Sequence, residues 1–251
     1  MKRYLGAPQG VMALKKLLRK PTLMAFDYDG TLAPICADPK VARISPGWLA
    51  RLKRINRRWP IAVISGRKLA DLSTRLGFEP AFIAGNHGAE SSVTPELRAV
   101  ARCLDAARGV LAAQGQALAA FGIVVEDKGM SLAVHYRLAH PAQDAAAFID
   151  RLLLALPAEL TVSHGTAVFN VMARAAPDKG DALLSAMRSC GVDHALYVGE
   201  EVNDEPAFAA ATATSVTVRL GSRLAPTHGR FALATQWQFG LLLRTLANWH
   251  R

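Results

Sequence analysis

Cysteine, acidic residues and long apolar runs are all scarce in this chain. The three cysteines, Cys36, Cys103 and Cys190, are odd in number and far apart, which excludes a disulfide framework and gives no zinc-binding pattern. No stretch approaches the roughly 18 to 20 consecutive apolar residues of a membrane-spanning helix. Gly, Pro and Lys interrupt the first 20 residues, unlike a signal peptide. We therefore expect a cytoplasmic protein without a membrane partner. We also expect a monomer, although none of these features gives the oligomeric state.

The shortage of acidic residues leaves 30 Lys and Arg against 20 Asp and Glu, a formal net charge of +10. Such an excess suits nucleic acid, an anionic small substrate or a solubilising surface. The densest basic run, residues 51–58, is interleaved with apolar residues at helical spacing, which is typical of the solvated face of an amphipathic helix. No nucleic-acid-binding motif accompanies it, so we expect no nucleic-acid partner.

Short apolar runs that stop at polar loops indicate buried parallel strands. In the first part of the chain they alternate with helices: strand 23–26, helix 45–58, strand 61–64, helix 68–76 and strand 81–84. The alternation returns later: helix 181–189, strand 195–198, helix 205–211, strand 215–218 and helix 238–249. This order predicts an α/β fold with a doubly wound parallel sheet.

The middle of the chain has a different pattern. A helix at 95–120, strands at 122–126 and 131–136, a helix at 143–154 and a hairpin of 160–163 with 168–173 are predicted. These elements predict a smaller α+β domain inserted into the core. We place the core domain at residues 1–91 and 174–251 and the inserted domain at 92–173.

Polar residues follow the ends of four predicted strands. They are Asp27 with Asp29, Ser65, Asn86 with His87, and Glu200 with Glu201, while Lys179 lies at a helix start. In an open parallel sheet, ligands bind in the crevice at the carboxyl ends of the strands. Two carboxylate pairs, a hydroxyl and a lysine are the groups that bind Mg²⁺ and a phosphoryl group together.

The carboxylates of Asp27 and Asp29 lie two residues apart directly after a strand. One can attack phosphorus to form an aspartyl phosphate, while the other protonates the leaving alcohol and later deprotonates water. Magnesium would neutralise the charge that repels the attacking anion. Taken singly, each motif has a structural alternative: a turn for residues 27–31, a helix cap for Ser65 and a loop histidine for His87.

Asp-Tyr-Asp-Gly-Thr-Leu at 27–32 resembles the first motif of phosphatases of the haloacid dehalogenase (HAD) superfamily. Ser65, Lys179 and residues 199–205 resemble the other three motifs, in the same order and at similar spacing. The inserted domain is similar to the substrate-selecting cap of the sugar-phosphatase branch. The resemblance implies a Rossmann-like core and a Mg²⁺-dependent phosphomonoester hydrolase.

Four further segments resemble motifs of trehalose-6-phosphate phosphatases: Ser-Gly-Arg at 65–67, Gly-Asn-His-Gly at 85–88, Glu-Asp-Lys-Gly at 126–129 and Pro-Asp-Lys-Gly at 177–180. This resemblance implies trehalose 6-phosphate as the substrate and a role in trehalose biosynthesis. It implies Asp27 as nucleophile, Asp29 as general acid and base, and phosphate contacts from Ser65 and Lys179. It also implies substrate contacts from the remaining motif residues, Gly66, Arg67, Asn86, His87, Glu126 and Lys128, the last two contacting the sugar hydroxyls and the phosphate.

The sequence departs from the family pattern where a metal-binding aspartate is expected, because Glu200 stands at that position. We expect the metal to be held by Asp27, Asp29 and Glu200, with Asp204 as an additional ligand or neighbour. Mg²⁺ requires near-octahedral geometry at about 2.0 to 2.1 Å, so the longer side chain should weaken metal binding or slow turnover. Two alternatives stay open: a phosphatase acting on another sugar phosphate, such as sucrose phosphate or mannosylglycerate phosphate, and a catalytically weak binding or regulatory protein.

Overall fold

The computed structural model describes residues 3–36, 38–91, 98–165, 167–221 and 226–249. The chain divides into two compact units, one formed by residues 1–93 with 177–251 and the other by residues 94–176. The sequence-based limits at residues 91 and 173 lie two and three residues before these divisions. Residue 92, where we placed the start of the inserted domain, lies outside the described residues.

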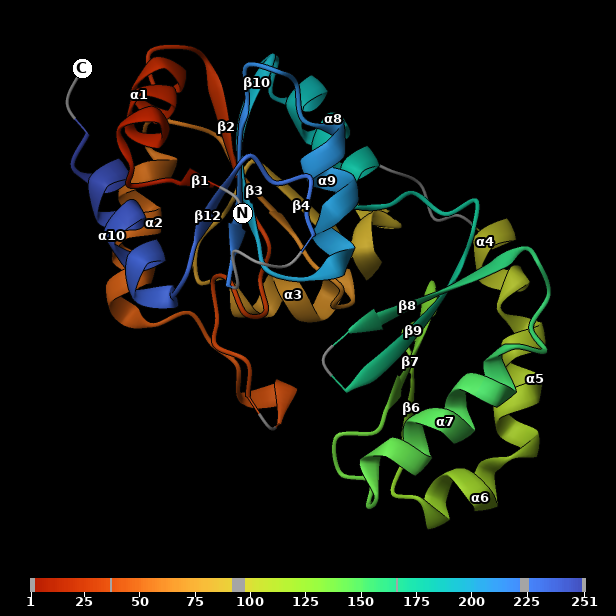
Figure 1. Ribbon diagram of the computed structural model, residues 1–251. Helices are drawn as coiled ribbons and strands as arrows, with labels where there is room; N and C mark the ends of the chain where they lie inside the picture. The colour runs from red at the N-terminus through yellow and green to blue at the C-terminus, as the bar shows by residue number, and fades with distance from the viewer. Residues whose placement is uncertain (1–2, 37, 92–97, 166, 222–225, 250–251) are drawn as a thin grey trace. The chain divides into compact units, whose positions relative to one another are not determined.

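The larger unit holds an eight-stranded sheet in the order β1-β12-β11-β10-β2-β3-β4-β5 (Figure 1). Neighbouring strands are parallel except β5, which runs antiparallel to β4. The strands are β1 (Arg3–Tyr4), β2 (Thr22–Phe26), β3 (Ile61–Ile64), β4 (Phe82–Gly85), β5 (Glu90–Ser91), β10 (His194–Gly199), β11 (Val216–Leu220) and β12 (Phe231–Leu233). The predicted α/β class is therefore confirmed.

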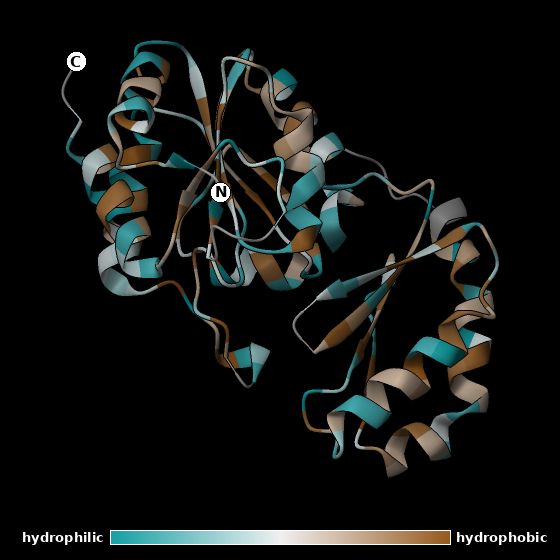
Figure 2. Cartoon of the chain, in the orientation of Figure 1, coloured by the Kyte–Doolittle hydropathy of each residue, from teal (hydrophilic) through white to brown (hydrophobic). Residues whose placement is uncertain are grey.

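Helices cover both faces of this sheet (Figure 1). On one face, α1 (Pro8–Leu17), α2 (Pro46–Asn56) and α10 (Gln236–Ala247) contribute to a core cluster with Met24 and Phe26 of β2. On the other face, α8 (Lys179–Ser189) and α9 (Glu205–Ala210) pack in a second cluster with Leu23 and Ala25. Because β2 is buried on both faces, its sequence is almost entirely apolar, as Figure 2 shows for the central strands.

The order of the strands reverses at β2. The chain proceeds from β2 to β3 and β4 on one side, and later returns to β10, β11 and β12 on the other. The backbone N–H of Asp27 donates to the carbonyl of Val198 at 3.0 Å, so the segment after β2 lies beside the end of β10. Such a reversal point is where open α/β sheets bind their ligands.

The smaller unit contains a four-stranded antiparallel sheet in the order β6-β7-β9-β8. Its strands are β6 (Val124–Asp127), β7 (Ser131–His135), β8 (Leu160–Gly165) and β9 (Val168–Ala173), followed or preceded by helices that include α7 (Ala142–Leu153). Leu132, Val134, Phe169 and Val171 share one buried face of this sheet. The strands and α7 agree with the predicted elements to within two residues at each end.

The helical stretch predicted at 95–120 is divided into shorter helices. The described part of this segment forms α4 (Arg98–Cys103), α5 (Asp105–Ala113) and α6 (Gly115–Ala120), while residues 95–97 lie outside the described residues. The second break, at Gln114, precedes Gly115, and glycine has low helix propensity. Among the described residues, none of the helices has the length and apolarity required to span a bilayer.

Candidate active site

The predicted site residues of the larger unit follow the carboxyl ends of neighbouring strands. Asp27 follows β2, Ser65 follows β3, and Glu200 follows β10. Asn86 and His87 follow β4, which is the next strand beyond β3. Because these four strands are adjacent and parallel, the polar residues lie along one edge of the sheet. The structure thus brings together residues that are up to 173 positions apart, counting from Asp27 to Glu200.

Lys179 joins two buried carboxylates from separate segments. Its Nζ donates to Asp27 Oδ1 and to Asp204 Oδ1, each at 2.7 Å. All three side chains are at most 5% exposed. Burial would lower the pKa of Lys179, but the charges of Asp204 and Asp27 outweigh it and raise that pKa above its ordinary value. Lys179 therefore stays an ammonium at neutral pH and fixes the orientation of Asp27.

Asp204 accepts hydrogen bonds on both carboxylate oxygens. Its Oδ1 accepts from Lys179 and from the hydroxyl of Tyr197, each at 2.7 Å. Its Oδ2 accepts the backbone N–H groups of Glu200 and Glu201 at 2.8 and 2.9 Å. Asp204 therefore positions Lys179 and the Glu200 backbone, which agrees with the neighbouring role that the sequence analysis left open beside metal ligation.

Glu200 carries a second carboxylate toward the loop after β2. A Cβ atom at Gly30 would lie 2.4 to 2.6 Å from Cδ, Oε1 and Cγ of Glu200, so the absence of a side chain at Gly30 lets the two segments approach. Gly30 also has a φ of +77°, which glycine adopts without strain. Burial raises the pKa of Glu200 to about 7, and the charges of Glu201 and Asp204 add to this effect.

These residues fit a magnesium ion held by few protein ligands. Mg²⁺ in proteins commonly takes one or two carboxylates and completes its octahedron with water and substrate phosphate. Asp27 and Glu200 provide two such carboxylates at the ends of adjacent strands. The described residues contain no group of three or more His, Cys, Asp or Glu side chains that could hold a metal. The four predicted ligands, Asp27, Asp29, Glu200 and Asp204, stay a prediction.

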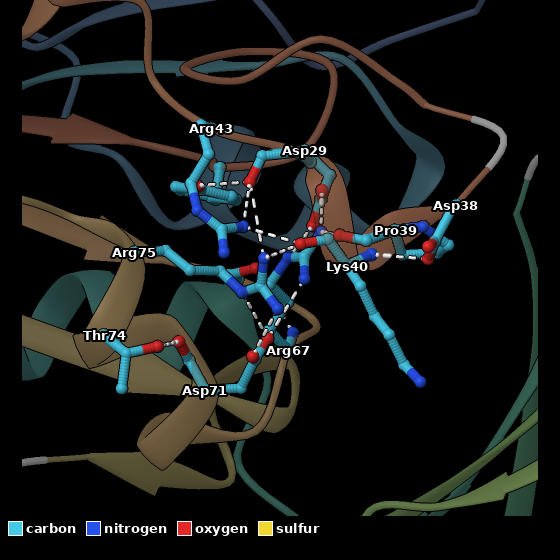
Figure 3. A network of polar contacts seen from close by, with 12 residues as sticks. Asp29, Asp38, Pro39, Lys40, Arg43, Arg67, Asp71, Thr74 and Arg75 are labelled. Carbon is cyan, nitrogen blue, oxygen red and sulfur yellow. Dashed lines mark hydrogen bonds and ion pairs between the residues drawn. The ribbon is translucent and has the colours of Figure 1, made fainter.

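Asp29 is bound by the guanidinium of Arg67 (Figure 3). Arg67 Nε donates to Oδ2 of Asp29 at 2.8 Å and Nη2 donates to Oδ1 at 2.6 Å. We predicted Arg67 to bind substrate and Asp29 to be a metal ligand, and both stay predictions; the structure pairs the two side chains with each other. Asp29 nevertheless keeps 41% of its side chain exposed, so its carboxylate is accessible from one side.

Residues 86–88 form a tight turn beside Ser65 and the start of α8. The N–H of His87 donates to the carbonyl of Ser65 at 2.9 Å, and both Asn86 and His87 have left-handed backbone conformations with φ of 48° and 59°. A Cβ atom at Gly66 would lie 2.4 Å from the His87 ring. A Cβ atom at Gly88 would lie 2.1 Å from the Asp178 carbonyl. The glycines therefore permit the close packing that places Asn86 and His87 at the candidate site.

A second ion pair anchors Arg67 from behind. Asp71 Oδ2 accepts from Arg67 Nη1 at 3.0 Å and from Arg75 Nε at 2.7 Å, while Oδ1 accepts from Arg75 Nη2 at 2.6 Å (Figure 3). Asp71 and Arg75 lie one turn apart on α3 (Leu69–Arg75). The hydrogen bonds from Arg75 lower the pKa of Asp71 below its ordinary value. Burial opposes this effect, and the hydrogen bond from Arg67 adds to it.

We expect Asp71 to contribute stability that is lost in acid. Since its folded-state pKa lies below the ordinary value of 3.8, the contribution is complete above about pH 4 and disappears as the pH falls through the folded-state value. The side chain is 37% exposed, so the contribution should be about 0.5 to 1 kcal/mol. Urea unfolding of Asp71→Asn at several pH values measures it, with the exposed Asp193→Asn as control. A difference that stays constant into acid would contradict this expectation.

The smaller unit carries the two predicted sugar-binding residues. Glu126 lies on β6, with its Oε2 at 3.1 Å from Nε2 of His135. Strand pairing puts Glu126, His135 and Asn170 on the same face of the sheet. Lys128 directly follows β6, and its backbone N–H donates to the carbonyl of Ser131 at 2.9 Å. The unit thus presents a polar sheet face that includes Glu126.

Sequence reasoning missed the roles of Tyr197, Asp71 and Arg75. Tyr197 lies in a buried, mostly apolar strand, where a tyrosine is usually a packing residue. The spacing of Asp71 and Arg75 identifies an ordinary helix ion pair. A signal for Tyr197 existed, because a fully buried tyrosine hydroxyl requires a hydrogen-bond partner.

Comparison with known proteins gives three findings. The family model described as trehalose-phosphatase matches residues 25–228. A trehalose-phosphate phosphatase from Mycobacterium tuberculosis is 34% identical over 221 residues, which cover 81% of this chain and 53% of that protein. The chain thus spans about half the length of the curated relatives it matches.

Two solved structures illustrate the similarity of fold. The C-terminal domain of the Candida albicans trehalose-6-phosphate phosphatase has a TM-score of 0.84 at 22% identity, covering 98% of this chain and 99% of that one. A phosphatase of the HAD superfamily from Bacteroides thetaiotaomicron has a TM-score of 0.61 at 16% identity, covering 90% of this chain and 94% of that one. At these identities the likeness supports the fold alone.

Proposed function

Because the chain belongs to the trehalose-phosphatase family, we propose that it hydrolyses trehalose 6-phosphate to trehalose and phosphate through an aspartyl-phosphate intermediate. The observation that carries this proposal is the buried pairing of Asp27 with Lys179 at the point where the strand order reverses. A carboxylate that is buried, oriented and held beside an ammonium is suited to attack an anionic phosphoryl group.

Asp27 acts as the nucleophile in this mechanism. One carboxylate oxygen is bonded to Lys179, and the other forms the new bond to phosphorus while the bond from phosphorus to the sugar oxygen breaks. Ser65 and Lys179 contact the phosphoryl oxygens and offset their charge. A magnesium ion, held by Asp27 and Glu200 when bound, supplies further charge neutralisation at the phosphoryl group.

Asp29 transfers protons in both half-reactions. It donates a proton to the sugar oxygen as that group leaves, and it then removes a proton from the water that hydrolyses the aspartyl phosphate. Phosphate is released and Asp27 is restored as a carboxylate. The exposed side of Asp29 is what allows a leaving alcohol, and then a water molecule, to reach this carboxylate.

Phosphate release from a panel of sugar phosphates tests the proposal. With Mg²⁺ present, kcat/KM should be highest for trehalose 6-phosphate and lower for sucrose phosphate, mannosylglycerate phosphate and glucose 6-phosphate. A higher kcat/KM for another member of the panel would replace trehalose 6-phosphate as the substrate. Release no faster than that of Asp27→Asn for every member would favour the binding or regulatory protein, which the glutamate at position 200 suggests.

Glu200→Asp should raise the affinity of the site for Mg²⁺. The shorter side chain matches the aspartate that the family places at this position, and even changes in the groups that orient metal ligands commonly cost roughly 10-fold or more in metal affinity. We expect the Mg²⁺ concentration for half-maximal activity to fall by about 10-fold in this variant. The neighbouring Glu201→Asp is the matched control. An unchanged Mg²⁺ titration of Glu200→Asp would show that Glu200 is not a ligand.

Glu126 and Lys128 are proposed to recognise the sugar phosphate, and their replacement should act on binding. We expect Glu126→Gln and Lys128→Met each to raise KM for trehalose 6-phosphate by about 10-fold, because each removes one charge-assisted hydrogen bond. Hydrolysis of p-nitrophenyl phosphate, which has no sugar, should stay within about twofold of the parent. Equal losses on the two substrates would indicate that these residues do not contact the sugar.

A further inference from the structure

Four charged side chains of alternating sign form a continuous chain that ends at the candidate site (Figure 3). Asp29, Arg67, Asp71 and Arg75 are linked in this order by hydrogen bonds of 2.6 to 3.0 Å. The far end is tied to the backbone, since Arg75 Nη1 donates to the carbonyl of Lys40 at 2.9 Å. The chain therefore connects Asp29 to helix α3 and to the segment around Lys40.

Arg67 is fixed by contacts on three sides. It makes four hydrogen bonds, two to Asp29, one to Asp71 and one to the carbonyl of Pro39 at 2.8 Å, out of the five N–H donors of a guanidinium. Its side chain is 10% exposed, and its Cζ lies 5.3 Å from the centre of the Tyr28 ring. A planar group held in this way sets the plane of the carboxylate that it binds through two bonds.

We propose that Asp71 and Arg75 are positioning residues for proton transfer, acting through Arg67 on Asp29. The inference rests on the proposed function, in which Asp29 is the proton-transfer group. Arg67 holds one side of the Asp29 carboxylate, and the 41% of the side chain that is exposed leaves the other side to the leaving alcohol or to water. Proton transfer needs a separation of about 2.6 to 3.2 Å between the heavy atoms, so the orientation of this carboxylate decides the rate.

Asp71 is the link on which this orientation depends. It is the second carboxylate bound to the largely buried Arg67, opposite Asp29, so it holds the guanidinium from the side away from the site. Arg75 in turn donates to both oxygens of Asp71. It thereby fixes the carboxylate in the orientation in which Oδ2 accepts the hydrogen bond from Arg67. Removing the charge of Asp71 lets Arg67 move with Asp29, and a displacement of about 1 Å can cost on the order of 100-fold in rate.

Comparing kcat/KM for two substrates with different leaving groups distinguishes a positioning role from a general loss of active-site structure. A sugar alkoxide leaves only with a proton from Asp29, whereas p-nitrophenolate leaves without one, and kcat/KM reports the step in which the leaving group departs. We expect Asp71→Asn and Arg75→Gln to lower kcat/KM for trehalose 6-phosphate by about 10-fold or more, and for p-nitrophenyl phosphate by less than about twofold. The exposed Asp193→Asn should change neither. Equal losses on both substrates would overturn the inference.

A double-mutant cycle tests whether Asp71 acts through Asp29. In an Asp29→Asn background the proton-transfer group is already absent, so adding Asp71→Asn should change kcat/KM for either substrate by less than about twofold. If kcat/KM for trehalose 6-phosphate falls by the same factor as in the parent background, the inference is overturned while the proposed function stays intact. If the parent protein hydrolyses neither substrate, the proposed function fails and the inference fails with it.

Discussion

Replacing Asp27 by asparagine should lower the rate of phosphate release from trehalose 6-phosphate by about 10⁴-fold or more, as removal of a catalytic nucleophile commonly does. An amide has the shape of the carboxylate but cannot form the acyl phosphate. The amide side chain would keep an oxygen that can accept from Lys179, as Oδ1 of Asp27 does in the parent, so the protein should fold. Steady-state phosphate release at saturating Mg²⁺ measures the loss.

A chemical signature accompanies this loss of rate. After brief reaction with substrate labelled in the phosphoryl group and acid quenching, the parent protein should carry label as an acyl phosphate. Asp29→Asn should carry more, because it lacks the base that activates water for the second step, and Asp27→Asn should carry none. Label retained by Asp27→Asn at the parent level would assign the nucleophile to another residue. Asp193→Asn, which removes an exposed carboxylate directly before β10, controls for the loss of one acidic group.

Lys179→Met should be the most destabilising single substitution at the site. It removes the one ammonium that binds both Asp27 and Asp204 and leaves two buried carboxylates without it. Breaking a buried pair in this way typically costs about 3 to 5 kcal/mol in the free energy of unfolding. Urea unfolding at pH 7 measures the difference, and Lys53→Met, on the exposed face of α2, is the matched control.

The cause of this loss of stability can be tested by removing the charge of one of the two carboxylates that Lys179 binds. In the double variant Lys179→Met with Asp27→Asn, Asp204 is the one member of this carboxylate pair that still carries a charge. Part of the lost free energy of unfolding should therefore return, so that the two substitutions differ from additivity by roughly 1 to 3 kcal/mol. Additive losses in the two variants would show that the destabilisation comes from packing of the lysine stem. A cost below about 1 kcal/mol for Lys179→Met alone would contradict the buried-pair account.

Much of the core could be predicted because its strands are short apolar runs that end in polar loops. The strand predicted at 61–64 coincides with β3. The helix predicted from residue 45 begins at Pro46, where the side chain of Ser45 caps it by accepting the N–H of Trp48 at 3.4 Å. Strands β1, β5 and β12 were not predicted, because two or three residues carry no detectable period. Helix α1 was not predicted either. Gly10 interrupts its pattern in sequence, yet it packs where a Cβ atom would lie 2.2 Å from the carbonyl of Leu5.

The residue types and the edge of the sheet were predictable at the candidate site, but the pairing of its charges was not. Position after a strand placed Asp27, Ser65 and Glu200 at one edge. That Asp204 binds Lys179 depends on the turn that aims both backbone N–H groups of Glu200 and Glu201 at it. That Arg67 turns to Asp29 depends on Asp71, which lies four residues further along the chain, in the first turn of α3. The spacing of residues in the sequence does not predict either of these two pairings.

The position of β2 between β3 and β10 has a consequence during synthesis on the ribosome. Strands β2, β3 and β4 emerge early, but β10, which pairs with the other edge of β2, follows about 170 residues later. Until then a nascent chain would present an unpaired edge on an almost entirely apolar strand, the kind of surface that promotes misassociation. Closing so distant a contact is slow. We expect nascent chains truncated before residue 194 to aggregate or to require a chaperone, and to become protease-resistant once β10 is complete.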